Sequence, residues 1–189
     1  MEKKRLIVAL SGASGAILGV RFLQALSAYR DWESHLILSK AAETTLVEET
    51  GLHPEEASQM ADHSYSIENM GAAIASGTYK TEGMVIIPCS MKTAAGICCG
   101  YSDNLLLRAA DVCLKERRKL VLVARETPLS EVHLRNMYEL SKMGAILLPP
   151  MLTFYNHPNT IDDMIHHIIG KTLDCFGLEL QNFRRWGAC

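Results

Sequence analysis

Four short polar segments, each directly after an apolar run, hold the side chains best suited to bind a phosphorylated ligand. They are Ser11-Gly12-Ala13-Ser14-Gly15, Ser39, Cys89-Ser90-Met91-Lys92-Thr93 and Arg125-Glu126. Glycine lets a backbone approach a ligand closely, and free N–H groups at the start of a helix attract a phosphate. Each segment alone is equally well explained by a tight turn or a helix cap. Together they indicate a ligand of nucleotide size.

The glycine spacing narrows the class of nucleotide. The first segment is not the GxGxxG pattern of dinucleotide-binding proteins, and the GxxxxGK[ST] pattern of a P-loop is missing as well. We therefore expect a nucleotide with few phosphates, and flavin mononucleotide (FMN) fits better than NAD.

Two other groups of residues resemble metal-binding motifs but have simpler explanations. Asp162-Asp163 resembles the paired carboxylates that bind magnesium, yet the pair follows Thr160 in the first turn of a predicted helix. Carboxylates in the first turn of a helix interact favourably with the helix dipole. His157 and His166-His167 lack the HExxH spacing of zinc enzymes. We therefore expect no metal site.

Alternating apolar runs and helical periodicity predict the elements that position the polar segments. Strands are expected at residues 6–10, 35–38, 83–88, 119–123 and 145–148, and helices at 16–29, 40–49, 104–116, 130–143 and 160–176. Residues 51–82 show no clear pattern. Strands that alternate with helices form βαβ units, so we predict one doubly wound α/β domain over residues 1–189 with a mainly parallel, Rossmann- or flavodoxin-like sheet. Such sheets bind ligands at the carboxyl ends of their strands, where the polar segments lie.

Composition excludes several functional classes. The 189 residues include 19 Lys+Arg and 21 Asp+Glu, and a net charge of −2 argues against a nucleic-acid or membrane-surface binder. Apolar runs are too short for a membrane span, and the apolar run of residues 6–10 is cut by Ser11 too early for a targeting signal. Six cysteines without CxxC spacing suit a reduced protein, so we expect a cytoplasmic location.

The four polar segments, together with others in the same order, resemble the UbiX-type flavin prenyltransferases. The further segments are Arg108-Ala109-Ala110-Asp111, Leu114-Lys115-Glu116-Arg117-Arg118, Thr127-Pro128-Leu129, Leu147-Leu148-Pro149-Pro150, Phe154-Tyr155 and Thr160-Ile161-Asp162-Asp163. The resemblance spans nearly the whole chain. It is greatest to the branch of the family that is paired with hydroxyarylic acid decarboxylases.

The resemblance implies an activity. A member of this family transfers a dimethylallyl group from dimethylallyl phosphate to N5 of reduced FMN, releases phosphate, and closes a fourth ring at the flavin C6. The product, prenylated FMN, passes to a UbiD-type decarboxylase. The resemblance also implies a homo-oligomer such as a dodecamer, with sites built between subunits, and a reaction without a metal.

The resemblance also assigns roles to residues. FMN would be held by Gly12, Ala13, Ser14, Ser39, Ser90, Met91, Lys92, Thr93 and Arg125, and the catalytic residues would be Ser14, Glu49, Arg125 and Glu126. Dimethylallyl phosphate would be bound by Lys115, Tyr155, Lys171 and Trp186. Lys171 stands where many members have arginine, so a point charge replaces a bidentate donor. Residues 177–189 would form a tail that packs near the site or against a neighbouring subunit.

Two alternatives stay open on the sequence alone. An FMN-dependent cysteine decarboxylase of the phosphopantothenoylcysteine type shares the architecture, but it requires a histidine early in the helix after the second strand. Residues 40–52 contain none. A non-catalytic flavin carrier subunit would need neither Glu49 nor Lys171. The sequence also leaves open whether the prenyl donor is a monophosphate or a diphosphate.

Overall fold

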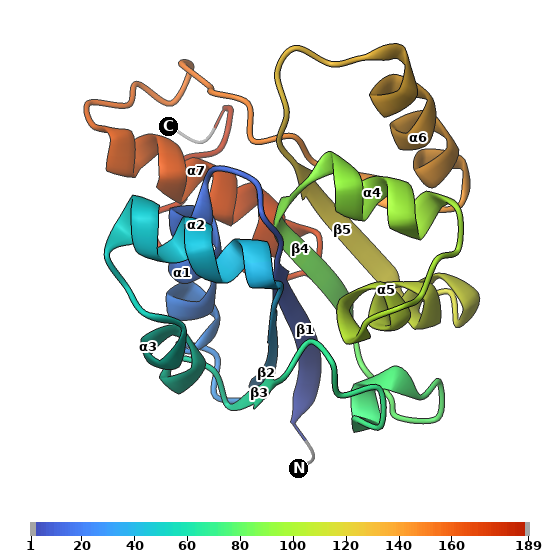
Figure 1. Ribbon diagram of the computed structural model, residues 1–189. Coiled ribbons are helices and arrows are strands. Elements are labelled where there is room, and N and C mark those ends of the chain that lie inside the picture. Colours follow the sequence, from blue (N-terminus) through green and yellow to red (C-terminus); the bar gives the residue numbers. More distant parts are fainter. Residues whose placement is uncertain (1–2, 188–189) are drawn as a thin grey trace.

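A central sheet of six parallel strands runs through the computed structural model, which describes residues 3–187 (Figure 1). The strands are β1 (Lys4–Leu10), β2 (Trp32–Leu38), β3 (His63–Tyr65), β4 (Gly83–Cys89), β5 (Lys119–Ala124) and β6 (Ile146–Leu147). They lie in the order β3-β2-β1-β4-β5-β6, and every neighbouring pair is parallel. The chain therefore extends the sheet in one direction from β1, returns to the centre, and extends it in the other.

Helices cover both faces of this sheet. They are α1 (Ala16–Leu26), α2 (Lys40–Thr50), α3 (Pro54–Gln59), a 3₁₀ turn η1 (Ala73–Ala75), α4 (Met91–Cys98), α5 (Leu105–Lys115), α6 (Glu131–Lys142) and α7 (Ile161–Asp174). One face packs against α1, α2, α3 and α7, and the other against η1, α4, α5 and α6. None of the helices within residues 3–187 has the length and apolar character to cross a lipid bilayer.

The continuous apolar strands follow from this double coverage. In β1, Leu6, Val8 and Leu10 belong to the core on the α1 and α7 side, whereas Ile7 and Ala9 belong to the core under α5. Successive side chains of a strand point to opposite faces, so a strand buried on both faces has no polar positions. Burial on both faces thus explains why these strands are visible in the sequence as apolar runs.

The predicted fold class is confirmed, and all five expected strands are present. The additional strand β3 lies in the segment that shows no pattern in the sequence. It is three residues long and lies at the edge of the sheet, where His63 and Ser64 are exposed. Helix α3 belongs to the same segment, and α4 is a full helix where the sequence indicates only a helix start at Ser90.

Candidate functional site

The carboxyl ends of the central strands meet at the upper edge of the sheet in Figure 1 and bring the predicted polar segments together. The Ser39 N–H donates to the Leu10 carbonyl at 3.0 Å, which joins the ends of β2 and β1. The Arg125 N–H donates to the Cys89 carbonyl at 3.0 Å, which joins the ends of β5 and β4. These backbone hydrogen bonds bring the loops to one edge of the sheet.

Ser11 holds the two halves of this edge in register. Its buried hydroxyl donates to the Pro88 carbonyl at 3.1 Å and accepts from the Ser90 N–H at 2.7 Å. The loop after β1 is thereby fixed to the loop after β4. Sequence reasoning places Ser11 in a polar motif but gives it no role, and a serine directly after an apolar strand is the only signal.

A cavity of about 910 Å³ opens at this edge and is large enough for a nucleotide. The predicted residues that line it are Gly12, Ser39, Ser90, Met91, Lys92, Thr93 and Glu126. Residues to which the sequence assigned no role in binding a nucleotide also line it, among them Tyr101, Asn104 and His133. The predicted residues Ala13, Ser14 and Arg125 do not line this cavity.

Two helices begin at the cavity wall, and a serine caps each of them. The Ser39 Oγ accepts from the Ala42 N–H at 3.1 Å, and the Ser90 Oγ accepts from the Thr93 N–H at 3.3 Å. The remaining first-turn N–H groups of a helix have no partner within that helix, and its dipole is positive at this end. The N-termini of α2 and α4, and the Lys92 side chain in the first turn of α4, therefore favour binding of an anionic group in the cavity.

The start of α1 already holds an anion, because Glu49 lies there. Its Oε2 atom accepts from the Gly15 and Ala16 N–H groups, both at 2.8 Å. The prediction that the free N–H groups of this helix start face a phosphate is therefore wrong for these two residues. The protein's own carboxylate, from the last turn of α2, takes that place.

The charge on Glu49 is stabilised by its surroundings. Burial raises the pKa of this carboxyl, but hydrogen bonds from the Ser14 side chain and the Gly15 and Ala16 amides, with the positive charge of Arg125, more than offset it. The pKa is lowered, so Glu49 is ionised at neutral pH. An ionised carboxylate can accept a proton but has none to donate, so this favours a role as proton acceptor over one as proton donor.

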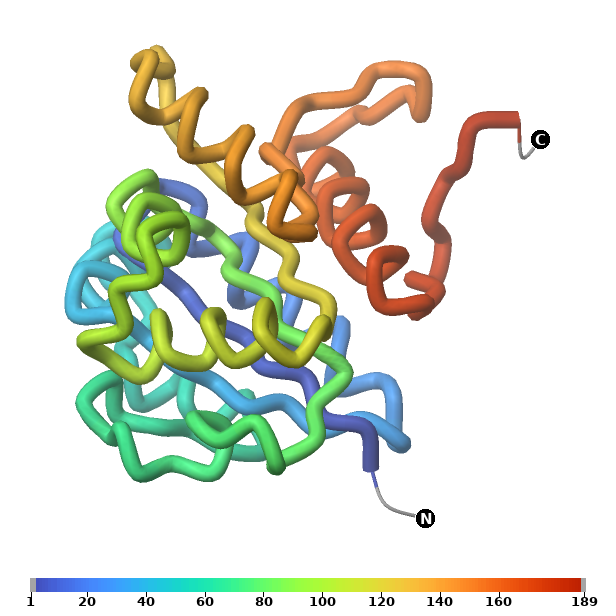
Figure 2. Tube along the Cα trace, turned by 90° about the vertical axis from the view of Figure 1, so that its right-hand side faces the viewer, coloured from blue at the N-terminus to red at the C-terminus, as the bar shows by residue number. Residues whose placement is uncertain are grey.

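A second, smaller cavity of about 190 Å³ lies beyond the end of β6, against α7. Tyr155 and Lys171 line it, together with Leu148 and His167. In Figure 2 the orange loop that carries Tyr155 lies beside α7. The Trp186 ring contacts the Tyr155 ring edge to face, with centroids 5.3 Å apart. Three residues assigned to the prenyl donor therefore lie together.

His167 is a functional candidate that sequence reasoning missed. Its Nε2 atom lies 3.2 Å from the Tyr155 hydroxyl, and its ring is buried. Burial, and then the positive charges of Lys171 and His166, lower the pKa of His167, so the ring is neutral at neutral pH. A neutral imidazole can orient the Tyr155 hydroxyl by accepting its proton or donating its own. In the sequence, the adjacent pair His166-His167 suggests only a metal motif.

Lys115 is not brought to these residues within a single copy of the chain. It is the last residue of α5, and β5 starts at Lys119, so it lies at the opposite, amino edge of the sheet. There it pairs with Glu116. The loops after β1, β2, β4 and β5 carry most of the other predicted residues and lie at the carboxyl edge, whereas Lys171 is in the last turn of α7.

Gly12 is required by the close approach of its loop to α2. A Cβ atom at this position would lie 2.3 Å from the Ala41 Cβ, a distance at which one backbone must shift. We expect Gly12→Ala to lower the free energy of unfolding by about 1–3 kcal/mol, as overpacking does, and to deform the large cavity. Gly71→Ala is the matched control, because its Cβ would meet only Asn69 Oδ1 at 3.6 Å. Denaturant unfolding of both variants checks this, and equal stability would contradict it.

Comparison with known proteins identifies the group to which this site belongs. The flavoprotein family matches residues 1–173. A probable UbiX-like flavin prenyltransferase of Sedimentibacter hydroxybenzoicus is 52% identical over 182 residues, which cover 96% of each chain.

Two solved structures superpose closely on the chain. A dodecameric FMN-dependent UbiX-like decarboxylase from Escherichia coli O157:H7 has a TM-score of 0.96 at 53% identity and covers 97% of this chain and 100% of its own. AnUbiX (PadA1), solved with FMN and dimethylallyl pyrophosphate, has a TM-score of 0.96 at 47% identity and covers 100% of both chains. The chain therefore belongs to the UbiX-like flavin prenyltransferases, enzymes of the flavoprotein family, as the resemblance in its sequence predicts.

Proposed function

We propose that this prenyltransferase joins the dimethylallyl group of dimethylallyl phosphate to N5 and C6 of reduced FMN. The observation that carries the proposal is the presence of two unlike cavities in one chain. The larger has the size for a flavin nucleotide and two helix starts for its phosphate. The smaller offers the cation of Lys171 and the hydroxyl of Tyr155.

A relative that was solved with bound ligands supports this choice of the two substrates. FMN and dimethylallyl pyrophosphate are bound in AnUbiX, whose chain superposes over its full length. By the same likeness, Ser39, Ser90, Met91, Lys92 and Thr93 would hold FMN in the larger cavity, where Gly12 gives the ring close access. The cysteine decarboxylase and carrier alternatives lose support, because curated relatives at 48% and 52% identity are described as a flavin prenyltransferase and a probable UbiX-like flavin prenyltransferase.

Glu49 is the proton acceptor of the proposed reaction. A bond forms between the flavin N5 and the first carbon of the donor, while the bond from that carbon to the phosphate oxygen breaks and the phosphate leaves with its electron pair. Ring closure then joins the flavin C6 to the third carbon of the dimethylallyl group. The double bond of that group breaks and its second carbon takes up a proton. N5 and C6 each give up a proton, and the ionised Glu49, next to Ser14, is placed to receive one of them.

Cationic side chains would neutralise the leaving phosphate. Lys171 and Tyr155 lie in the smaller cavity, and Arg125 acts on Glu49 through its charge. Glu126 lines the larger cavity. Stabilising charge that develops in the transition state is commonly the largest catalytic contribution. Because side chains supply the positive charge and the chain has no aspartate-rich magnesium motif, we propose the monophosphate as donor and a reaction without a metal.

The C-terminal tail would form an aromatic wall for the prenyl group. Trp186 packs on Tyr155 and is otherwise open to solvent, with 79% of its surface exposed. An aromatic face stabilises an allylic cation through its π electrons. The tail is predicted at residues 177–189, of which 188–189 lie outside the described residues.

A second copy of the chain would complete the site. One relative is dodecameric, and this chain exposes apolar side chains around the smaller cavity, including Met151, Phe154 and Ile161. Lys115 lies at the far edge of its own sheet, so it can serve a phosphate only in a neighbouring copy. We therefore propose a homo-oligomer, on the scale of a dodecamer, with Lys115 contributed across the interface.

The product would be consumed by a UbiD-type decarboxylase, and we place the chain in the branch that serves hydroxyarylic acids. The support is the sequence resemblance to that branch. We also propose a cytoplasmic location, because free thiols suit a reducing compartment. The free thiols are Cys89, Cys98, Cys99, Cys113 and Cys175.

Anaerobic incubation with reduced FMN and dimethylallyl monophosphate tests the proposed reaction. Mass spectrometry of the extracted flavin is expected to show the mass of one added dimethylallyl group and the release of one phosphate. A parallel incubation with the diphosphate is expected to give far less product. Flavin that binds but returns unmodified with both donors would overturn the proposal.

A further inference from the structure

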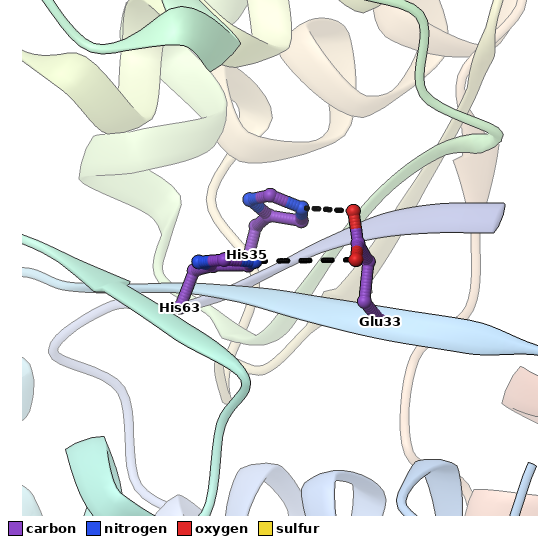
Figure 3. Close-up of side chains that lie close together, drawn as sticks. All are labelled: Glu33, His35 and His63. Carbon is purple, nitrogen blue, oxygen red and sulfur yellow. Dashed lines mark ion pairs between the residues drawn. The ribbon is translucent and has the colours of Figure 1, made fainter. Parts of the chain in front are cut away.

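Glu33, His35 and His63 form a cluster near the beginnings of β2 and β3, away from both cavities (Figure 3). His35 and His63 are register partners on neighbouring parallel strands. Glu33 precedes His35 by two residues, so both side chains project from the same face of β2. Two imidazoles and a carboxylate are thus held on one sheet face by backbone pairing alone.

The spacing of the potential ligand atoms suits a single ion. His35 Nε2 lies 3.5 Å from Glu33 Oε1, and His63 Nε2 lies 3.9 Å from Glu33 Oε2. One ligand atom from each residue lies within 4.8 Å of the others. Ligands of a tetrahedral zinc ion stand roughly 3.3–3.5 Å apart, since each bond is about 2.0–2.1 Å long. The His35 and His63 rings stack with centroids 4.6 Å apart and an interplanar angle of 22°, so the half-exposed His63 ring must turn out of this stack to share an ion with His35.

His35 is the residue that points most directly to a ligand. Its side chain is fully buried, and its Nδ1 atom lies 2.9 Å from the Tyr65 hydroxyl. Its Nε2 atom makes no hydrogen bond of good geometry within residues 3–187, and it faces Glu33 Oε1 at 3.5 Å. A buried polar atom without a partner is costly, whereas a metal ion would satisfy it. A metal-binding histidine normally makes a hydrogen bond through its other ring nitrogen, and the Tyr65 hydroxyl supplies that bond at Nδ1.

Glu33 is the only carboxylate of the cluster, and it also pairs with the Arg5 guanidinium. Burial first, and then the neighbouring charges of His63 and Arg5, lower the pKa of His35 more than Glu33 raises it. Arg5 donates to Glu33 Oε1 at 2.8 Å and stacks on the Tyr79 ring, which leaves Oε2 on the side of His63.

We propose that His35 Nε2, His63 Nε2 and Glu33 Oε2 bind one divalent transition-metal ion of the zinc class, with water in the fourth position. Two histidines, one carboxylate and a water form a known zinc ligand set. The exposed side of His63 gives the ion an entry path. The ion would tie the short edge strand β3 to β2 and steady the chain that continues to Ile67 and Glu68 in the cavity wall. This inference does not depend on the proposed function.

Metal titration of the full chain tests the site. Chelator-treated, reduced protein is titrated calorimetrically with Zn²⁺, and we expect one tight site per chain. His63→Asn is expected to weaken this binding at least about 100-fold, because it removes a direct ligand. Loss of only a hydrogen-bond partner of a ligand already lowers metal affinity about 10–100-fold. His53→Asn is the matched control, since His53 is an exposed helix cap outside the cluster and asparagine also caps helices. It is expected to bind Zn²⁺ like the wild type.

Two further measurements separate this site from the free thiols and from loss of structure. Co²⁺ is expected to give the visible absorption of a four-coordinate site without the sulfur-to-cobalt charge-transfer absorption of a cysteine site. Tyr65→Phe is expected to weaken Zn²⁺ binding about 10–100-fold, with unchanged circular dichroism in the metal-free state. Equal Zn²⁺ binding by the wild type and His63→Asn, or a sulfur-bound Co²⁺ spectrum, would overturn the proposal.

Discussion

Replacing Glu49 with glutamine is expected to slow prenyl transfer by about 10²–10⁴-fold while FMN binding stays nearly unchanged. Glutamine keeps an oxygen that can accept from the Gly15 and Ala16 amides, so the start of α1 stays capped. It removes the basic oxygen that is to receive a proton from the flavin. Single-turnover measurement of the prenylated flavin, with FMN affinity measured separately, distinguishes the two effects.

Glu48→Gln is the matched control, since it makes the same change one residue away on an exposed side of α2. It is expected to retain the wild-type rate. A Glu49→Gln enzyme that keeps the wild-type rate would remove Glu49 from the mechanism and direct attention to Glu126 in the cavity wall.

The pH dependence of stability offers a second readout for Glu49. Its pKa in the folded chain lies below the ordinary value of 4.5, so its ionised form stabilises the fold. This contribution is complete above the unfolded pKa and is lost as the pH falls below about 4.5 and through the folded pKa. The stability difference between wild type and Glu49→Gln is therefore expected to shrink in acid, as followed by denaturant unfolding.

Removing the cation of Lys171 is the second change with a large expected effect. Lys171→Ala is expected to lower kcat/KM for dimethylallyl phosphate by about 10²–10³-fold, the usual cost of one lost charge-stabilising group. Lys171→Arg is expected to retain activity, because a guanidinium offers two parallel donors to a phosphate. Lys142→Ala, a lysine on the exposed surface of α6, is the control and is expected to behave like the wild type.

The same variant has a spectroscopic signature. The charge of Lys171 contributes to the lowered pKa of His167, so its removal is expected to raise that pKa. An NMR titration of the His167 ring measures the change. An unchanged His167 pKa together with unchanged kinetics would show that Lys171 does not act in the smaller cavity.

The fold could be predicted largely because the central strands are buried on both faces of the sheet. Strands such as Leu6–Leu10 show as uninterrupted apolar runs only because helices cover both faces of the sheet. Strand β3 could not be seen in this way. Its three residues lie at an edge, and pairing with β2, rather than any pattern of their own, makes them a strand.

The site was predictable to the extent that it depends on strand ends. Parallel topology alone places Gly12, Ser39 and Ser90 at one edge. It does not show that Glu49 reaches the start of α1, because that contact joins residues 34 positions apart through the packing of two helices. The cluster of Glu33, His35 and His63 was invisible for the same reason, since its ligands come from two strands and share no local spacing.

The central position of β1 has a consequence for how the chain folds and unfolds. Leu6 pairs with Ser34 of β2 on one side and with Gly83 of β4 on the other. Strand β1 therefore belongs to the N-terminal half of the sheet, β1 to β3, and also pairs with β4, the first strand of the C-terminal half. The contacts with β4 span most of a half-chain and carry the larger loop-closure cost. The large cavity takes its walls from both halves, from Gly12 to His133, and so it exists only after they have joined. A bound nucleotide is therefore expected to act as a kinetic clamp that slows separation of the two halves, with little effect on the rate at which they first meet.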